Sequence, residues 1–265
     1  MPVKTASDHW VLSDKTDNNQ MKQASGIAPN SENSFRQAII DCCRQLNTAN
    51  LNTGRAGNLS TLWHRGGEAG MLITPSAMHY DQMTIDDIVW MPLKQPAGKN
   101  DAMVTDGHNK PSSEWRMHQT LYLSSDGSGN PGNSGTRAVL HVHSPFATTL
   151  ACLPRVQAEG LPAFHYMIAV AGGNNLRCAP YALFGSEELS AAMQQAIAGR
   201  RACLLANHGQ IAVGADIRAA FDLAAEVEDL CRLYWQALQI GEPVILTDKQ
   251  MVAVHESFAS YSYRK

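Results

Sequence analysis

The chain has 265 residues, of which 44% are hydrophobic, and its formal net charge is -3 at pH 7. This length can bury a sizeable core in one larger domain or two small ones, and we expect one. The slight acidic excess excludes the basic footprint of a nucleic-acid binder, so the expected partners are small molecules. No apolar run is long enough for a membrane span or a signal peptide, and we expect a cytoplasmic protein.

The first third of the chain changes in character near residue 32. Residues 1–31 are rich in Ser, Asn, Asp, Lys and Gln without apolar periodicity, which predicts a disordered or loosely ordered leader. From Ser34, apolar residues recur at helical spacing as far as Leu46 and predict the first helix. Two short apolar runs, 71–73 and 88–91, are typical of buried strands.

A loop and a helix are expected next. Residues 94–111 contain Pro, Gly, Lys, Asn and Asp without periodicity and predict a surface loop. A helical pattern resumes over 114–123. The segment 126–135 is dense in turn-forming residues, so we expect a flexible insertion before a strand at 138–143.

The last third predicts two helices with a strand between them. The helices cover 186–197 and 216–240, the second ending at Gly241, and the strand covers 202–206. Strands and helices alternate irregularly along the chain. This pattern predicts a layered α/β domain over residues 32–265, but it does not determine the order or direction of the strands.

Three histidines are candidate metal ligands. His141 and His143 lie on a predicted strand, where residues two apart share a face at a spacing of ~6.5–7 Å. His208 follows another predicted strand and precedes Gly209, so a turn could direct its ring inward. Three protein ligands with an open position are typical of catalytic zinc. The alternative for His208 is a core histidine bonded to the backbone.

Short polar turns are candidates for binding an anion. Ser112 and Ser113 lie at a predicted helix start, where free N–H groups and the helix dipole favour an anion, and Glu114 follows them. The alternative is an ordinary serine cap with a glutamate in the first turn. Residues 57–60 and 74–77 are two further polar turns, and together these segments could form a phosphate nest. His118, four residues after Glu114, could support the site but is not counted among its residues.

Seven segments between residues 54 and 214 have the order and spacing of a known family. They are GRAGNLS (54–60), MLITPS (71–76), KPSSEWRMH (110–118), VLHVHSP (139–145), PAFHYMIAVAGG (162–173), CAPYALFG (178–185) and LLANHGQIAVG (204–214). On these motifs the chain, from about residue 34 to 263, resembles class II sugar-phosphate aldolases of the aldolase/adducin family. It resembles most the branch that acts on L-fuculose 1-phosphate.

The resemblance implies a fold, a reaction and a cofactor. The fold would be a layered α/β/α sandwich around a central, largely antiparallel or mixed β-sheet. The reaction would be the reversible cleavage of a ketose 1-phosphate, either L-fuculose 1-phosphate or a 5-deoxypentulose 1-phosphate, to dihydroxyacetone phosphate and a small aldehyde such as L-lactaldehyde. The enzyme would be a lyase that uses Zn²⁺, with Mn²⁺ or Co²⁺ as alternatives. It would form a homotetramer with active sites at subunit interfaces and bind neither nucleic acid nor membranes.

The resemblance also assigns roles to single residues. It implies that His141, His143 and His208 bind the metal, and that Glu114 is both a resting-state ligand and the catalytic acid/base. The residues implied to hold the substrate phosphate are Asn58, Ser76, Ser112 and Ser113.

Two tyrosines and one departure from the family pattern complete this set. Tyr166 matches a tyrosine that reaches the active site of a neighbouring subunit and protonates the aldehyde oxygen. Tyr261 matches, better than Tyr263, a tyrosine of a mobile C-terminal tail that closes the site. Ala77 stands where the family usually has glycine, and alanine adopts a positive φ less easily. Its effect on phosphate binding is left open.

Other functions share this scaffold. Pentulose-phosphate epimerases, sugar-acid phosphate decarboxylases and thio-pentulose-phosphate dehydratases use a similar set of metal-binding histidines, so fold and metal do not select the reaction. The segments HYMIAVAGG and CAPYALFG favour the aldolase. A non-catalytic module like the adducin head is a further alternative, but it does not need the four candidate metal ligands.

Overall fold

The computed structural model describes residues 30–94, 105–124 and 135–262. The predicted leader, apart from its last two residues, lies outside this description, as do most of the loop at 94–111 and nearly all of the insertion at 126–135. Those three predictions therefore stay predictions.

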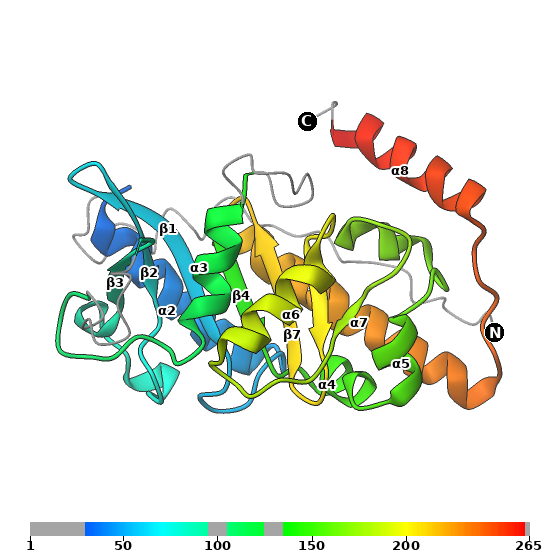
Figure 1. Cartoon of the computed structure of the whole chain (residues 1–265), viewed down its shortest axis with the longest axis horizontal. Coiled ribbons are helices and arrows are strands. Elements are labelled where there is room, and N and C mark those ends of the chain that lie inside the picture. The colour runs from blue at the N-terminus through cyan, green and yellow to red at the C-terminus, as the bar shows by residue number, and fades with distance from the viewer. Residues whose placement is uncertain (1–29, 95–104, 125–134, 263–265) are drawn as a thin grey trace, which may run out of the picture.

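A seven-stranded sheet forms the centre of the fold (Figure 1). Its order is β3-β2-β1-β4-β7-β6-β5, and every neighbouring pair is antiparallel except β5 and β6, which are parallel. The expected mixed, largely antiparallel sheet is therefore confirmed. The strands are β1 (Asn58–Arg65), β2 (Glu68–Ile73), β3 (Val89–Pro92), β4 (Ala138–Val142), β5 (Cys178–Ala179), β6 (Ala202–Leu205) and β7 (Gly209–Gly214).

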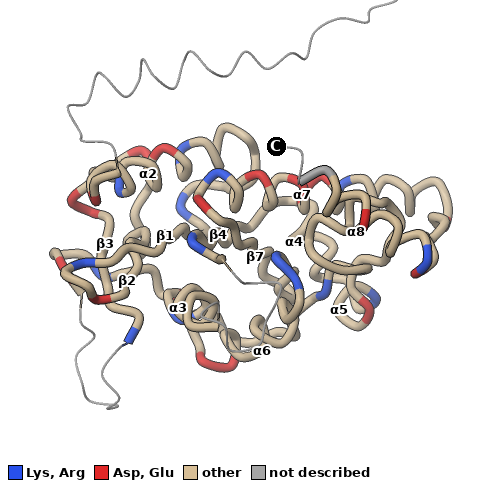
Figure 2. The backbone as a smooth tube through the Cα atoms, turned by 90° about the horizontal axis from the view of Figure 1, so that it is seen from above, with Lys and Arg blue, Asp and Glu red and all other residues tan. Residues whose placement is uncertain are grey.

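Helices cover both faces of this sheet and form the outer layers. Figure 2 shows α3 and α6 on one side of the strands and α2 and α7 on the other. None of the described helices is long and apolar enough to cross a membrane. The helices are α2 (Glu32–Thr48), α3 (Trp115–Ser124), α4 (Pro145–Ala151), α5 (Pro154–Glu159), α6 (Glu187–Ile197), α7 (Ile217–Ile240) and α8 (Asp248–Ser262), with short 3₁₀ turns at Tyr80–Gln82, Ile85–Asp87 and Tyr166–Ala171.

Two hydrophobic clusters, one on each face, hold the layers together. Strand β4 contributes to both because its side chains alternate between the faces. Leu140 and Val142 pack into the cluster under α2, α4 and α7, whereas Val139 packs into the cluster under α3 and α6. His141 therefore shares the α3 face with Val139. The polar site is built on this side of the sheet.

Most predicted elements are present within one to three residues of their expected ends, but two segments differ from expectation. The polar run 57–60 was expected as a turn, yet strand β1 begins at Asn58. Its polar side chains are buried and hydrogen-bonded, so the strand lacks the apolar alternation that would reveal it. The C-terminal segment, expected as a tail, lies in helix α8 as far as Ser262.

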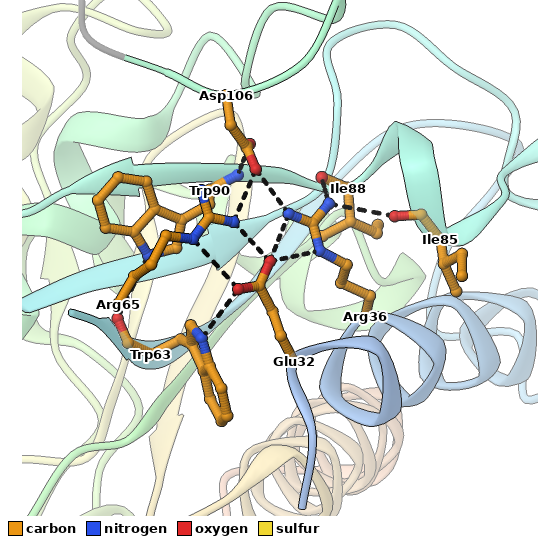
Figure 3. A network of polar contacts seen from close by, with 8 residues as sticks. All are labelled: Glu32, Arg36, Trp63, Arg65, Ile85, Ile88, Trp90 and Asp106. Carbon is orange, nitrogen blue, oxygen red and sulfur yellow. Dashed lines mark hydrogen bonds and ion pairs between the residues drawn. The ribbon is translucent and has the colours of Figure 1, made fainter. Parts of the chain in front are cut away.

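Four charged groups tie the first helix to the edge of the sheet (Figure 3). Glu32, in the first turn of α2, lies 2.7 Å from Arg36 and 2.6 Å from Arg65 at the end of β1. Asp106 lies 2.7 Å from Arg36 and 2.8 Å from Arg65. It also accepts a hydrogen bond from the backbone N–H of Trp90 on β3. Two carboxylates and two guanidinium groups thus alternate in one network.

The network lowers the pKa of both carboxyl groups. Burial alone would raise the pKa of Glu32, but the hydrogen bonds and charges of Arg65 and Arg36 together outweigh it. The pKa of Asp106 is held below its usual value by the same balance. A carboxyl whose pKa is lower in the folded chain stabilises the fold above its unfolded pKa, and this contribution is lost as the pH falls through the folded pKa. Stability should therefore decline below about pH 4.5.

Replacing Glu32 by Gln should show how much this network contributes to the free energy of unfolding. The change keeps the side-chain size but leaves Arg36 and Arg65 with one carboxylate instead of two. We expect the free energy of unfolding at pH 7, measured with urea, to fall by about 1–3 kcal/mol. The difference from the unmodified chain should shrink toward pH 3. The control is Glu68→Gln, an exposed position on β2. An equal loss in both variants would contradict the prediction.

Candidate active site

The end of β4 and the turn between β6 and β7 bring the three candidate histidines together. His141 lies on β4, and His143 follows the strand on the same face. His208 lies in the turn between β6 and β7, and β7 pairs with β4 so that His141 is opposite Ile211. This turn approaches β4 so closely that a Cβ at Gly209 would lie 2.4 Å from the carbonyl oxygen of Val142. Glycine at 209 therefore allows the third histidine to reach the other two.

The three imidazoles converge on one point. Their candidate ligand nitrogens all lie within 4.8 Å of one another. The Nε2 atoms of His141 and His143 are 3.0 Å apart, and the three ring centroids are separated by 4.7–4.9 Å. At this distance one ring can donate a hydrogen bond to the other, or two lone pairs can share a cation that lies between them. The arrangement is that of ligands grouped around an ion.

The protonation states of these rings suit a metal. Burial lowers the pKa of His141 to about 3 and that of His208 to about 4, and it also lowers the pKa of His143. All three rings are therefore neutral at pH 7, as ligand histidines must be. The Nδ1 of His141 donates to the carbonyl oxygen of Gln210 at 2.9 Å. That bond leaves the lone pair of Nε2 directed at the cluster.

Glu114 supplies a fourth donor at the same point. It immediately precedes α3, in a segment fixed to the sheet by the Ser112 N–H, which donates to the carbonyl of Thr74 at 2.9 Å. Its Oε2 lies 3.3 Å from Nε2 of His141, and its Oε1 lies 3.3 Å from Nε2 of His208.

This set of donors fits a divalent cation. Only 6% of Glu114 is exposed, and within the described part of the chain its Oε1 has no hydrogen-bond partner. A buried carboxylate oxygen without a partner is costly, and a bound cation would remove that cost. Three imidazole nitrogens and one carboxylate are donors that zinc accepts. The residues that sequence reasoning assigned to the metal are thus brought together by the fold.

A pocket of about 350 Å³ opens beside this cluster of side chains. Its size lies within the usual range of small-molecule sites. Its lining includes His143, His208 and Glu114, so the donor cluster forms one wall. All four residues that were expected to hold a phosphate, Asn58, Ser76, Ser112 and Ser113, also line it.

The backbone around the phosphate residues is locally strained. Gly57 has a φ of 78°, and a Cβ there would lie 2.5 Å from the carbonyl oxygen of His141. Ala77 adopts a φ of 58°. The chain therefore keeps at Ala77 the left-handed conformation that glycine adopts more easily, at a cost of about 1 kcal/mol. The turn therefore forms with a positive φ even though alanine, and not glycine, stands at position 77.

Two features of the pocket were not predicted from the sequence. Arg55 lines it and donates from Nη1 to the carbonyl of Ala77 at 3.0 Å, so a cation stands beside the expected phosphate residues. The available sequence signal was the arginine of the motif GRAGNLS. The lining also includes Tyr181 and Phe184, whose exposures of 66% and 63% leave much apolar surface open.

His118, which was not counted among the predicted site residues, contacts the site through Asn58. It is fully buried, and its Nε2 lies 2.5 Å from Oδ1 of Asn58 while its Nδ1 lies 2.7 Å from Oγ of Ser60. The amide of Asn58 in turn donates to Oε2 of Glu114 at 2.9 Å. The spacing of four residues between Glu114 and His118 was the available signal.

Tyr166, one of the two predicted tyrosines, is not brought to this pocket within one chain. Tyr166 begins the 3₁₀ turn Tyr166–Ala171, is 48% exposed and stacks near Phe258 of α8. It is not among the residues that line the pocket. Tyr261 lies in α8, with its side chain outside the described part of the structure. Their predicted roles depend on a neighbouring subunit or on movement, and they stay predictions.

Comparison with known proteins agrees with this geometry. The family model described as "Class II Aldolase and Adducin N-terminal domain" matches residues 37–235. The chain belongs to the class II aldolase and adducin family. The expected resemblance is thereby confirmed.

Similar proteins carry aldolase names. A 5-methylthioribulose-1-phosphate/5-deoxyribulose-1-phosphate aldolase of Rhodospirillum rubrum is 44% identical over 233 residues, which cover 88% of this chain and 95% of that protein. The L-fuculose phosphate aldolase of Escherichia coli K12 is 38% identical and covers 88% and 97%. A solved L-fuculose 1-phosphate aldolase superposes with a TM-score of 0.72 at 37% identity, covering 85% of this chain and 96% of the other. The chain is thus an enzyme of the lyase class, a class II aldolase.

Loss of one imidazole should empty the metal site of this aldolase. His143→Ala removes one of the two partly buried ligands, so it should disturb folding less than loss of the fully buried His141. We expect the variant to melt within a few degrees of the unmodified protein but to retain less than about a tenth of its divalent metal after dialysis. Metal is measured by mass spectrometry of the purified protein. His79→Ala, at an exposed position, is the control. Full metal occupancy in His143→Ala would exclude it as a ligand.

Proposed function

We propose that this aldolase reversibly cleaves a short deoxyketose 1-phosphate into dihydroxyacetone phosphate and a small aldehyde. The candidate substrates are L-fuculose 1-phosphate, which would release L-lactaldehyde, and 5-deoxypentulose 1-phosphates. Relatives named for both activities support this choice. The observation that carries it is a cluster of three imidazoles and one carboxylate, of which His143, His208 and Glu114 line a pocket that also holds four predicted phosphate ligands.

The phosphate would bind at the polar end of this pocket. Ser76, Ser112 and Ser113 offer hydroxyl groups there, and Asn58 offers an amide. Arg55 brings a positive charge, and its guanidinium keeps further N–H donors besides the one given to Ala77. Anchoring the phosphate far from the bond that breaks would orient the three-carbon unit.

Bond cleavage needs an electron sink and a proton carrier. A divalent ion held by His141, His143, His208 and, before substrate binds, Glu114 would supply Lewis-acid polarisation of the ketose carbonyl. When the bond between C3 and C4 breaks, the electron pair stays on C3, and Glu114 would deliver a proton to that carbon. The hydroxyl on C4 loses its proton as the aldehyde forms. Tyr166 of the partner subunit would exchange that proton.

Apolar side chains in the pocket lining support a deoxy substrate. They include Tyr181 and Phe184, and Ala182 lies between them along the chain. A methyl group at the end of the sugar would bury apolar surface against these side chains, whereas a hydroxyl would gain less from the same contacts. We therefore infer that the leaving aldehyde carries an unsubstituted alkyl end.

The proposal also includes the metal ion, the oligomeric state and the cellular location. Zn²⁺ is the expected ion because nitrogen-rich sets of this kind suit it, with Mn²⁺ or Co²⁺ as alternatives. A homotetramer with sites at the subunit interfaces would bring Tyr166, and by movement Tyr261, to a neighbouring pocket. The exposed position of Tyr166 supports that arrangement. The cytoplasm, where small sugar phosphates are handled, is the proposed location.

One assay separates this reaction from the other chemistries of the scaffold. Metal-loaded protein is incubated with a panel of ketose 1-phosphates and 5-phosphates, and triose-phosphate release, epimerisation, loss of CO₂ and loss of water are followed separately. We expect triose-phosphate release from 1-phosphates with an alkyl end. Epimerised, decarboxylated or dehydrated product without triose phosphate would reject the aldolase proposal in favour of the corresponding alternative. Metal binding without turnover of any substrate would favour a non-catalytic, adducin-like role.

Glu114→Gln should separate metal binding from proton transfer. The amide oxygen can still face the cluster, but glutamine cannot carry the proton. We expect the metal content to stay close to that of the unmodified enzyme while kcat falls by about 10²–10⁴-fold. Metal analysis and steady-state kinetics on the same preparation measure both. Unchanged kcat would remove Glu114 from the mechanism.

Arg55→Gln should weaken substrate binding more than turnover. The change removes the cation beside the phosphate residues but leaves the reacting end of the pocket intact. We expect KM to rise about tenfold, as for one charge-assisted contact at a partly exposed position, with kcat within about threefold of the unmodified enzyme. Arg155→Gln, at a surface position outside the pocket lining, is the matched control. An unchanged KM in the Arg55 variant would show that Arg55 does not contact the phosphate.

A further inference from the structure

A line of buried polar side chains runs from Glu114 into the interior. Asn58 donates from Nδ2 to Oε2 of Glu114 at 2.9 Å, and its Oδ1 lies 2.5 Å from Nε2 of His118. The Nδ1 of His118 lies 2.7 Å from Oγ of Ser60, which lies 2.7 Å from the hydroxyl of Tyr122. Each of these side chains is at most 6% exposed. Such a row is costly to bury unless every member has a partner.

Two periodicities place these residues in one line. Glu114, His118 and Tyr122 are spaced by four residues, so they follow one face of α3 and the turn before it. Asn58 and Ser60 are spaced by two residues and therefore share one face of β1. The helix packs against this face of the strand. The members of the two elements then alternate along the row.

Counting protons fixes the direction of every bond. Because Asn58 uses its amide N–H toward Glu114, its Oδ1 must accept, and Nε2 of His118 must carry a hydrogen. A neutral imidazole then has a lone pair on Nδ1, so Ser60 must donate to it. Ser60 has one hydroxyl hydrogen, and Tyr122 must therefore donate to Ser60. The row allows a single arrangement of donors and acceptors.

Burial agrees with the neutral ring. It lowers the pKa of His118 to about 3, and the neighbouring His141 adds to the shift. The ring is therefore uncharged at physiological pH. In either protonation state Nε2 carries the hydrogen that Asn58 needs.

We propose that His118, supported by Ser60 and Tyr122, is a positioning residue that fixes the orientation of the Asn58 amide and through it the carboxylate of Glu114. A rotated Asn58 would turn its oxygen toward the carboxylate and repel it. In the fixed orientation one N–H of Nδ2 holds Oε2, and the other is available to the pocket that Asn58 lines. The amide thus connects the phosphate pocket with the proton carrier. This inference rests on the proposed aldolase reaction.

The first test compares two replacements of His118. Leucine removes both ring nitrogens, whereas glutamine keeps one donor and one acceptor in a single planar group. We expect His118→Leu to lower kcat by about 10–100-fold, the usual effect of a misplaced catalytic group, with metal content unchanged and KM changed less than kcat. His118→Gln should recover most of kcat. Equal kcat losses in the two variants would overturn the proposal, as would kcat within twofold of the unmodified enzyme in His118→Leu.

The second test removes one hydroxyl from each face of β1. Ser60→Ala breaks the row, whereas Thr61→Val removes a buried hydroxyl on the opposite face, where it donates to the carbonyl of Arg137 at 3.0 Å. The two variants lose similar buried contacts, so a purely structural effect would treat them alike. We expect kcat to fall at least fivefold more in Ser60→Ala. Equal kcat values in both variants would count against the row, even if His118→Leu fails to fold.

A third measurement does not depend on activity. Histidine labelled with ¹⁵N in the ring reports by NMR which nitrogen carries the hydrogen. We expect His118 in the Nε2–H form, with its Nδ1 signal moving toward that of a free acceptor in Ser60→Ala but not in Thr61→Val. The Nδ1–H form in the unmodified protein would overturn the proposed direction. If the unmodified enzyme cleaves no ketose phosphate, the proposed function fails while this measurement still decides the row.

Discussion

The antiparallel pairing of β1 with β4 is the constraint on which the site depends. In this register Asn58 stands opposite His141 and Ser60 stands opposite Val139. Paired residues point to the same side of a sheet, so the metal-binding face of β4 and the polar face of β1 become one surface. A shift by one residue between the two strands would turn one of these sets of side chains toward the other layer. The pocket, which is lined by both Asn58 and members of the donor cluster, requires this pairing, whereas the three imidazoles also require the pairing of β4 with β7.

Polar groups at this surface are stabilised by one another rather than by water. The three imidazoles remain uncharged because burial penalises the cation, and His141 keeps its orientation through the carbonyl of Gln210. Glu114 is the exception, since its Oε1 has no hydrogen-bond partner among the described residues. A carboxylate oxygen without a hydrogen-bond partner, next to uncharged imidazole nitrogens, favours the binding of a cation. The stability that such a site costs must come from elsewhere in the fold.

Two other parts of the molecule supply that stability. The hydrophobic clusters on the two faces of the sheet bind the helices to the strands. At the far edge, Glu32 and Asp106 link α2 with β1 and β3 through Arg36 and Arg65. Ala77 and Asn207, two of the four described non-glycine residues with positive φ values, line the pocket beside the phosphate and metal residues. The packed layers therefore hold the polar residues of the pocket in place.

The sequence by itself determined the class of the fold, four of the seven described α-helices, four of the seven strands, and the candidate metal ligands. Helical and strand periodicities are local properties, and the spacing of His141 and His143 follows from one strand alone. The strand before His208 and the glycine after it added a third candidate ligand, and polar turns indicated an anion site. Motif resemblance then assigned roles to Glu114 and to the phosphate residues. Strand β1 was missed because its polar residues are satisfied by partners distant in sequence, which a local pattern does not reveal.

Only the tertiary structure decided which distant groups touch. Ser60 and His118 are 58 residues apart in the chain, and their contact depends on how α3 packs on β1. The same holds for Arg55 beside Ala77 and for the apolar wall formed by Tyr181 and Phe184. Hydrogen bonds between separate elements depend on register and packing, which are set by the whole core. For that reason the candidate ligands could be named from the sequence, while most of the contacts that orient them could not.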